Sequence, residues 1–337
     1  MSRKSSTISS IVLLRAIAAL WVCVIHIGMV AGFSGQGIIN FIIREGQNGV
    51  AIFFVISGFI LPYSLYKNEY QINYFFNFLF RRSIRIDPPY WASIALIFIL
   101  TPLAFPSLNI FNILLHITYA VPFVKGAQWY SGVYWTLSIE FQFYILLGLF
   151  YPLLMKIDSR LTCVILIAIT FLFVNVLKFN YRGIFFTNIY DFVFGFILFL
   201  GYVKKINYKV LWATLILFGV YIMMAVSIKT GFTPLATSAF IWFFRRNKRV
   251  PILSFLGDIS YSLYLIHLPV STFYADKVHT IIKNNCILFI TCILVSIAAA
   301  SAYYLIVEKP SMKLSKWVAL RKLKVKNSNP TYSQDSA

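Results

Sequence analysis

Long apolar runs separated by short polar stretches recur from near the N-terminus to about residue 307. A helix that crosses the hydrocarbon core of a bilayer needs about 20 predominantly apolar residues, with a range of roughly 17–25. On this measure the pattern predicts transmembrane helices over residues 8–30, 49–66, 88–105, 132–154, 161–177, 184–203, 208–228, 234–244, 252–273 and 286–307. The run at 234–244 is the shortest of them. The predicted fold is an all-α, polytopic membrane helix bundle of about ten transmembrane helices.

One further apolar stretch, 108–124, does not fit this pattern. Pro102, Pro106 and Pro122 interrupt it or lie just before it, and proline breaks a helix interior. We expect a re-entrant or interfacial element there. The first apolar run lacks a small-residue cleavage site, which favours a retained helix over a removed signal peptide.

Composition and charge support a multi-pass membrane protein. Hydrophobic residues make up 60% of the 337 residues and charged residues 12%, whereas soluble domains average roughly 45–50% and about 25%. With alternating helices and a cytoplasmic N-terminus, 22 of the 30 lysines and arginines fall on the cytoplasmic side and seven on the other. This bias follows the positive-inside rule. It predicts that both termini are cytoplasmic, and it explains most of the net charge of +20 without a nucleic-acid partner.

The chain divides into a membrane domain, residues 1–310, and a basic cytoplasmic tail, residues 311–337, whose polar end we expect to be disordered. No extracytoplasmic domain is predicted, so the activity is expected in the membrane bundle itself. The four cysteines lie in or beside apolar runs without paired spacing, which is typical of small core residues. No metal site is predicted.

Two ionisable residues stand in the first apolar run, Arg15 and His26. Ionisable groups inside a membrane are costly and usually mark function. The two are 11 positions apart, which brings them within about 20° on one helix face and separates them by roughly 16 Å along the axis. The alternative is an arginine that reaches the membrane surface and a histidine with an ordinary interior partner.

Glu140 lies in the fourth predicted helix, at about the depth of His26. A carboxylate beside an imidazole fixes its tautomer and stabilises the imidazolium, as in acid–base sites. We therefore expect Glu140 to lie beside His26. A structural ion pair is the alternative.

Other polar positions are less specific. Arg82 and Arg85 share a helical face before Pro88 and Pro89, and arginines bind phosphates bidentately; the positive-inside rule also accounts for arginines here. Ser57 in the second helix suits close helix packing. In the ninth helix, Asp258 is expected to be an N-terminal cap, and His267 could bind the carbonyl that Pro269 leaves without a partner.

Together these motifs resemble the bacterial integral-membrane acyltransferase family 3, which includes O-antigen and exopolysaccharide O-acetyltransferases. The resemblance runs from about residue 8 to 310. It rests on an Arg–ten residues–His pattern at Arg15 and His26, an FFxxSGF segment at Phe53–Phe59, and an Arg–x–x–Arg motif at Arg82 and Arg85. It also rests on a Ser–x–Glu motif at Ser138 and Glu140, the segment SYSLYLIH at 260–267, and EKP at Glu308–Pro310.

The resemblance implies acetyl-CoA, or another acyl-CoA, as acyl donor and a lipid-linked glycan as acceptor at the bacterial inner membrane. It implies that His26 is catalytic and that Arg15, Arg82 and Arg85 bind the donor. We add Glu140 as the second catalytic residue, and Ser57, Trp135, Ser138 and His267 as candidates for substrate binding or structural support. Transfer could be direct or pass through an acyl-histidine.

Membrane proteins of two other functional classes have a similar amino-acid composition. A secondary transporter also has many helices with buried charge, but it often shows two related halves, and none is evident in this sequence. A non-catalytic membrane scaffold would not need Arg15, His26 or Glu140. The acceptor could be lipopolysaccharide O-antigen, exopolysaccharide, peptidoglycan or a lipid-linked sugar.

Overall fold

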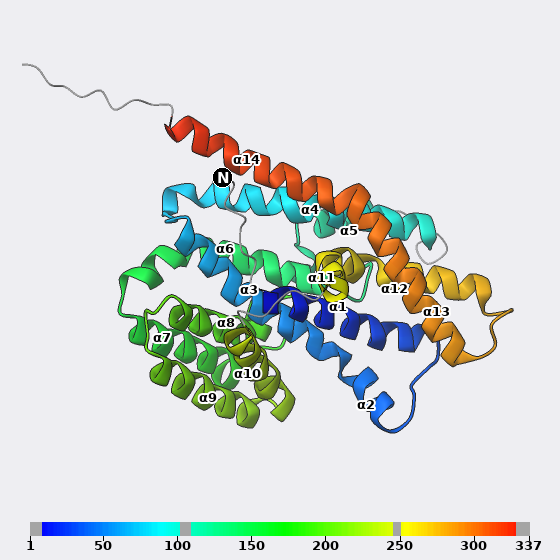
Figure 1. The fold of residues 1–337 in the computed structure, drawn as a ribbon, viewed down its shortest axis with the longest axis horizontal. Coiled ribbons are helices and arrows are strands. Elements are labelled where there is room, and N and C mark those ends of the chain that lie inside the picture. Colours follow the sequence, from blue (N-terminus) through cyan, green and yellow to red (C-terminus); the bar gives the residue numbers. More distant parts are fainter. Residues whose placement is uncertain (1–8, 102–108, 245–250, 328–337) are drawn as a thin grey trace, which may run out of the picture.

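The computed structural model describes residues 9–101, 109–244 and 251–327, and within these ranges it is helical without strands (Figure 1). The α-helices are α1 (Ser9–Val30), α2 (Gly37–Arg44), α3 (Asn48–Lys67), α4 (Phe75–Leu100), α5 (Ile110–Ile117), α6 (Trp135–Lys156), α7 (Ser159–Phe171), α8 (Ile189–Tyr202), α9 (Tyr208–Ala225), α10 (Ile228–Phe243), α11 (Pro251–Asp258), α12 (Ser260–Val278), α13 (Asn285–Tyr303) and α14 (Lys309–Asn327). Short 3-10 helices (η1, η2, η4 and η6) lie in the connections, and two π-helical segments, η5 (Leu172–Val176) and η7 (Tyr304–Glu308), extend α7 and α13.

Seven helical stretches of the described chain are long and apolar enough to cross a membrane, and the bent pair α11–α12 makes an eighth if it is one span. These eight overlap eight of the ten predicted spans, and two of them, Gly37–Lys67 and Asn285–Val318, are longer than predicted. The other two correspond to α4 and α10. α4 carries four charged residues between Arg81 and Asp87, and α10 has 16 residues. The all-α polytopic bundle is therefore confirmed, and the two further spans remain predictions.

Helix α4 differs from its prediction. It begins at Phe75 and not at residue 88, so Arg82 and Arg85, which precede the predicted span, lie inside the helix, and Pro88 and Pro89 lie in its middle. Prolines donate no backbone hydrogen bond. Tyrosine hydroxyls from neighbouring elements bind carbonyls close to them: Tyr261 donates to Ile86 O at 3.0 Å, and Tyr303 donates to Pro89 O.

The apolar stretch after α4 forms the short helix α5 and the 3-10 helix η4 (Val121–Phe123). Asn109 caps α5 by accepting a hydrogen bond from the backbone N–H of Asn112 at 3.0 Å. Pro102 and Pro106 lie outside the described residues.

Helices α3 and α8 run side by side at very short separation (Figure 1). A Cβ atom on Gly58 would lie 2.3 Å from the carbonyl oxygen of Phe192, and one on Gly195 would lie 2.2 Å from that of Val55. Only glycine permits this contact, which is the usual role of small residues between membrane helices. Ser57 is thereby held on the part of α3 that faces α6.

The last helices form one long, bent rod. α13 passes through η7 into α14, and α14 lies along α4 (Figure 1). Ser315 donates a hydrogen bond to Arg81 O at 2.8 Å across this contact. The basic tail predicted from residue 311 is thus helical to Asn327, and its polar end, residues 328–337, lies outside the described residues.

Candidate active site

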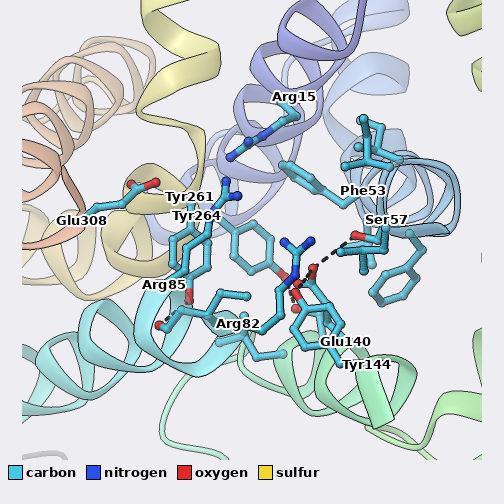
Figure 2. A pocket seen from close by; sticks show the side chains of 18 residues that line it. Arg15, Phe53, Ser57, Arg82, Arg85, Glu140, Tyr144, Tyr261, Tyr264 and Glu308 are labelled. Carbon is cyan, nitrogen blue, oxygen red and sulfur yellow. Dashed lines mark hydrogen bonds between the residues drawn. The ribbon is translucent and has the colours of Figure 1, made fainter. Parts of the chain in front are cut away.

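Three arginines from two helices converge on one cavity of about 150 Å³ (Figure 2). Arg15 comes from α1, and Arg82 and Arg85 come from α4. We call this space the arginine cavity. Its other polar and aromatic lining residues are Phe53, Phe54, Ser57, Thr136, Glu140, Tyr144, Tyr261, Tyr264 and Glu308. The structure thus brings together the three arginines that the sequence predicted to bind the acyl donor.

Arg15 is anchored at the bend between α11 and α12. Its Nε donates to Ser260 Oγ at 3.2 Å, and that hydroxyl donates to Gly257 O at 2.8 Å. A Cβ on Gly257 would lie 2.3 Å from the carbonyl oxygen of Val12. The close approach of α11 to α1 therefore places this bend beside Arg15.

Glu308, at the end of η7, caps the start of α12. Its Oε2 accepts hydrogen bonds from Ser262 N at 3.1 Å and from Ser262 Oγ at 2.6 Å. The first N–H groups of a helix have no partner within the helix, so a carboxylate is favourable there. The prediction that Asp258 caps this helix is wrong, because Asp258 ends α11 and the residue that precedes α12 is Ile259.

Glu140 lies in the arginine cavity and is held by two hydroxyl groups. Ser57 Oγ donates to Glu140 Oε1 at 3.2 Å, and Tyr144, one turn later on α6, donates to the same oxygen (Figure 2). The Arg82 guanidinium lies over the Tyr144 ring, 5.9 Å from its centroid. The carboxylate is thus part of the same polar network as the arginines.

Two further predicted residues of α6 have structural partners. Ser138 donates to Tyr119 O at 2.9 Å, and Gln142 donates to Ser138 Oγ at 3.1 Å and to Gly183 O at 2.7 Å. The Trp135 ring lies under the Arg182 guanidinium, 5.5 Å from its centroid. These contacts join α6 to the loops around it, which fits the structural alternative predicted for Ser138 and Trp135.

His26 pairs with His267 and not with Glu140. His26 Nδ1 lies 3.0 Å from His267 Nε2, and the two rings are stacked with centroids 5.2 Å apart. Within the described residues Glu140 has no hydrogen bond to either histidine. The predicted contact between His26 and Glu140 is therefore wrong. The cause is helix neighbourhood: α1 packs on α12 and α3, and α6 packs on α3 and α4.

His267 is completely buried. Its Nδ1 lies 3.0 Å from Leu263 O and 2.9 Å from Tyr264 O. The carbonyl that Pro269 leaves without its helical partner is that of Leu265, four residues earlier. His267 therefore does bind backbone carbonyls, but earlier ones than predicted.

Tyr264 connects the histidine pair to the arginine cavity. Its ring lines the cavity, packs edge-on against Phe53 with centroids 5.7 Å apart, and lies 6.3 Å from the His267 ring. The Tyr264 hydroxyl is bound to Thr136 Oγ1 at 2.7 Å. His26 and His267 do not line the cavity. The histidine pair therefore lies beside the cavity, and His267 follows the cavity residue Tyr264 by about one turn of α12.

The cavity is suited to an anion. Its lining has three guanidinium groups and two carboxylates, Glu140 and Glu308, and arginines bind phosphate groups by charge-assisted, bidentate hydrogen bonds. In the described part of the chain no three His, Cys, Asp or Glu residues come together as metal ligands do.

Three site residues were missing from the candidates predicted from sequence: Glu308, Tyr144 and Tyr264. Glu308 had a usable signal, because it is an acid directly after a predicted span. Tyr144 had another, because it stands four positions after Glu140 and thus on the same helix face. Tyr264 lies in the SYSLYLIH segment and Glu308 in the EKP segment that carry the family resemblance, but neither was singled out as a site residue.

Comparison with known proteins gives one family and one relative. Over 133 residues the chain is 32% identical to nodulation protein 10 of Rhizobium leguminosarum bv. viciae; the alignment covers 33% of this chain and 34% of that protein, so about a third of the relative is matched. No solved structure matches the chain. The acyltransferase domain profile of family 3 matches residues 8–305, nearly the whole described bundle. The chain therefore belongs to the membrane acyltransferase family 3.

Proposed function

We propose that the protein transfers an acetyl group from acetyl-CoA to a sugar hydroxyl of a surface polysaccharide, with lipopolysaccharide O-antigen as the first candidate acceptor, at the bacterial inner membrane. Membership of the acyltransferase family supports the reaction class. The observation that carries the donor assignment is the convergence of Arg15, Arg82 and Arg85 on one cavity.

Acetyl-CoA carries several phosphate charges and a thioester at the end of a long, thin arm. In the proposal, Arg82 and Arg85 hold the phosphates by bidentate, charge-assisted hydrogen bonds. Arg15, fixed by Ser260 at the α11–α12 bend, guides the arm toward Tyr264. Glu140 and Glu308 line the same cavity and offset part of the positive charge of the three guanidinium groups.

His26 is the proposed general base. Its Nε2 takes the proton of the acceptor hydroxyl while the hydroxyl oxygen forms a bond to the thioester carbonyl carbon. The bond between this carbon and sulfur then breaks, and the proton passes from His26 to the leaving thiolate, which yields free coenzyme A and the sugar ester. A positioned general base typically contributes 10²–10⁴-fold to the rate.

Purified protein in liposomes, supplied with labelled acetyl-CoA and extracted glycan, tests the reaction class. We expect label in the glycan and an equal amount of free coenzyme A. Uptake of label into the vesicle lumen without glycan labelling would instead indicate a transporter.

The acceptor is tested separately by mass spectrometry of surface glycans from cells with and without the gene. Loss of one acetyl mass increment per repeat unit from the O-antigen is the expected result. An unchanged O-antigen together with a changed peptidoglycan or exopolysaccharide would move the proposal to that acceptor.

A further inference from the structure

His267 has the burial and hydrogen bonding of a group with a fixed protonation pattern. The ring is 0% exposed, and both ring nitrogens have partners within hydrogen-bond distance. A charged imidazolium is strongly disfavoured in such a place without a carboxylate beside it, and the partners here are two carbonyls and another imidazole. We therefore treat His267 as neutral, with a single N–H.

The backbone of α12 decides which nitrogen of His267 carries that hydrogen. Nδ1 lies 3.0 Å from Leu263 O and 2.9 Å from Tyr264 O. A carbonyl oxygen only accepts hydrogen bonds, so Nδ1 must be the donor. In a neutral imidazole the other nitrogen then carries the lone pair, and Nε2 of His267 is an acceptor.

This acceptor faces His26 Nδ1 at 3.0 Å. Two acceptors cannot form a hydrogen bond, so Nδ1 of His26 must donate. The lone pair of a neutral His26 is then on Nε2, the nitrogen directed away from the pair. The backbone carbonyls of one α12 turn thus favour the Nδ1–H tautomer of a residue on α1, whose ring also has a hydrogen bond to the Val22 carbonyl of its own helix.

We propose that His267 is a positioning residue that holds His26 in the Nδ1–H tautomer, so that Nε2 is free to take the proton of the acceptor hydroxyl. The inference rests on the proposed function of His26 as general base. It assigns to a histidine the role that a carboxylate has in other acid–base sites, where the bond at one ring nitrogen sets the state of the other.

The contact between His26 and His267 also stabilises the protonated form of His26. When Nε2 of His26 takes the hydroxyl proton, the ring becomes an imidazolium and its Nδ1–H bond to His267 becomes charge-assisted, which about doubles its strength. His267 keeps its own Nδ1 proton on the α12 carbonyls throughout. The proton on His26 Nε2 leaves with the thiolate, and the pair returns to its starting state.

The same turn of α12 lines the acyl-donor side. Tyr264, whose carbonyl binds His267, has its side chain on the arginine cavity. Its hydroxyl is bound to Thr136 of α6 at 2.7 Å. Tyr264, whose carbonyl orients His267, is therefore fixed twice: its backbone is part of helix α12, and its hydroxyl is bound to α6.

Three variants test the proposal in liposomes. His267→Leu removes the acceptor for His26 Nδ1, and His267→Gln places an amide oxygen there that can still accept. His116→Gln is the matched control: His116 is also 0% exposed, binds Asn112 O through Nδ1 at 2.8 Å and accepts from Tyr130 N at 3.1 Å, and has no contact with the pair.

We expect His267→Leu to lower kcat about 10- to 100-fold, the size expected for loss of a hydrogen bond to a charged group, with KM for acetyl-CoA unchanged. His267→Gln should recover most of kcat, and His116→Gln should leave kcat and KM unchanged. Wild-type kcat in His267→Leu would overturn the proposal. So would an equal fall in all three variants, which would reveal a general packing effect.

A measurement on the resting protein separates this inference from the proposed function. Labelling with ¹⁵N-histidine gives signals from only four histidines, assigned by single substitutions. The expected spectrum has His26 protonated on Nδ1 and unprotonated on Nε2, with loss of this preference in His267→Leu. A His26 protonated on Nε2 in the wild type overturns the inference alone; the expected tautomer in a protein without transferase activity overturns the proposed function.

Discussion

The hydroxyl of Ser57 donates a hydrogen bond to the carboxylate of Glu140 at 3.2 Å, across the interface of α3 and α6. The same carboxylate oxygen also accepts from Tyr144, and all three side chains line the arginine cavity. Glu140 therefore adds negative charge to a cavity that is proposed to bind a polyanion. Its expected influence is on acyl-donor binding and not on the base.

Glu140→Gln keeps the shape of the side chain and its ability to accept from Ser57, but removes one negative charge. Repulsion between Glu140 and the phosphates disappears, so we expect Kd for acetyl-CoA to fall several-fold at low ionic strength. The gain should shrink as salt screens the charges. Equilibrium binding in detergent measures it, with Ser57→Ala as the uncharged control. A large loss of kcat at unchanged Kd would instead show that Glu140 acts in catalysis together with the histidine pair and not in donor binding.

Arg82→Gln and Arg85→Gln should weaken acetyl-CoA binding about 10- to 100-fold each, as expected when a charge-assisted hydrogen bond to phosphate is lost. The dependence of Kd on salt should become shallower. Arg81→Gln is the matched control, because Arg81 is on the same helix and does not line the cavity. An equal loss of affinity in all three variants would show a general effect of basic charge and not a built phosphate site.

Glu308→Ala should lower the stability of the protein. The substitution leaves the backbone N–H of Ser262 without its cap, and loss of a helix cap costs about 0.5–2 kcal/mol. Glu308→Gln should cost less, because its amide oxygen still accepts. The midpoint of thermal unfolding in detergent reports the difference. Lys309→Ala, at the exposed neighbouring position, should leave the midpoint unchanged; a fall as large as that of Glu308→Ala would contradict the capping role.

Gly58→Ala should destabilise the bundle, because the new methyl group meets the Phe192 carbonyl oxygen at 2.3 Å. Overpacking of a tight contact typically costs about 1–3 kcal/mol. Gly132→Ala is the control, since its nearest contact would be 3.9 Å away, at Leu268. Thermal unfolding of both variants side by side is the measurement, and equal midpoints would mean that α3 and α8 can separate freely.

The sequence was informative about helix positions and about which side chains are unusual. The predicted first and sixth spans, 8–30 and 184–203, agree closely with Ser9–Val30 and with Phe185–Tyr202. Ionisable residues in apolar runs also led directly to Arg15 and His26. Both inferences depend on local sequence alone.

Contacts between helices were not predictable in the same way. Depth along a helix follows from residue number, and it placed His26 and Glu140 at one level. Which helices are neighbours depends on packing of the whole bundle, and α12, not α6, lies against α1 at that level. The start of α4 was missed for a different reason: four charged residues between Arg81 and Asp87 interrupt its apolar pattern, so hydropathy recognises only its later part as a span.

The central claim is that His26 is the base for acyl transfer while the arginines hold the acyl donor. A single preparation of His26→Ala in liposomes tests both parts, with Kd for acetyl-CoA and transfer of labelled acetyl to glycan measured on the same sample. We predict an unchanged Kd and a transfer rate lower by about 10²–10⁴-fold, the contribution of a general base. Transfer at the wild-type rate by a variant that binds acetyl-CoA normally would contradict the account.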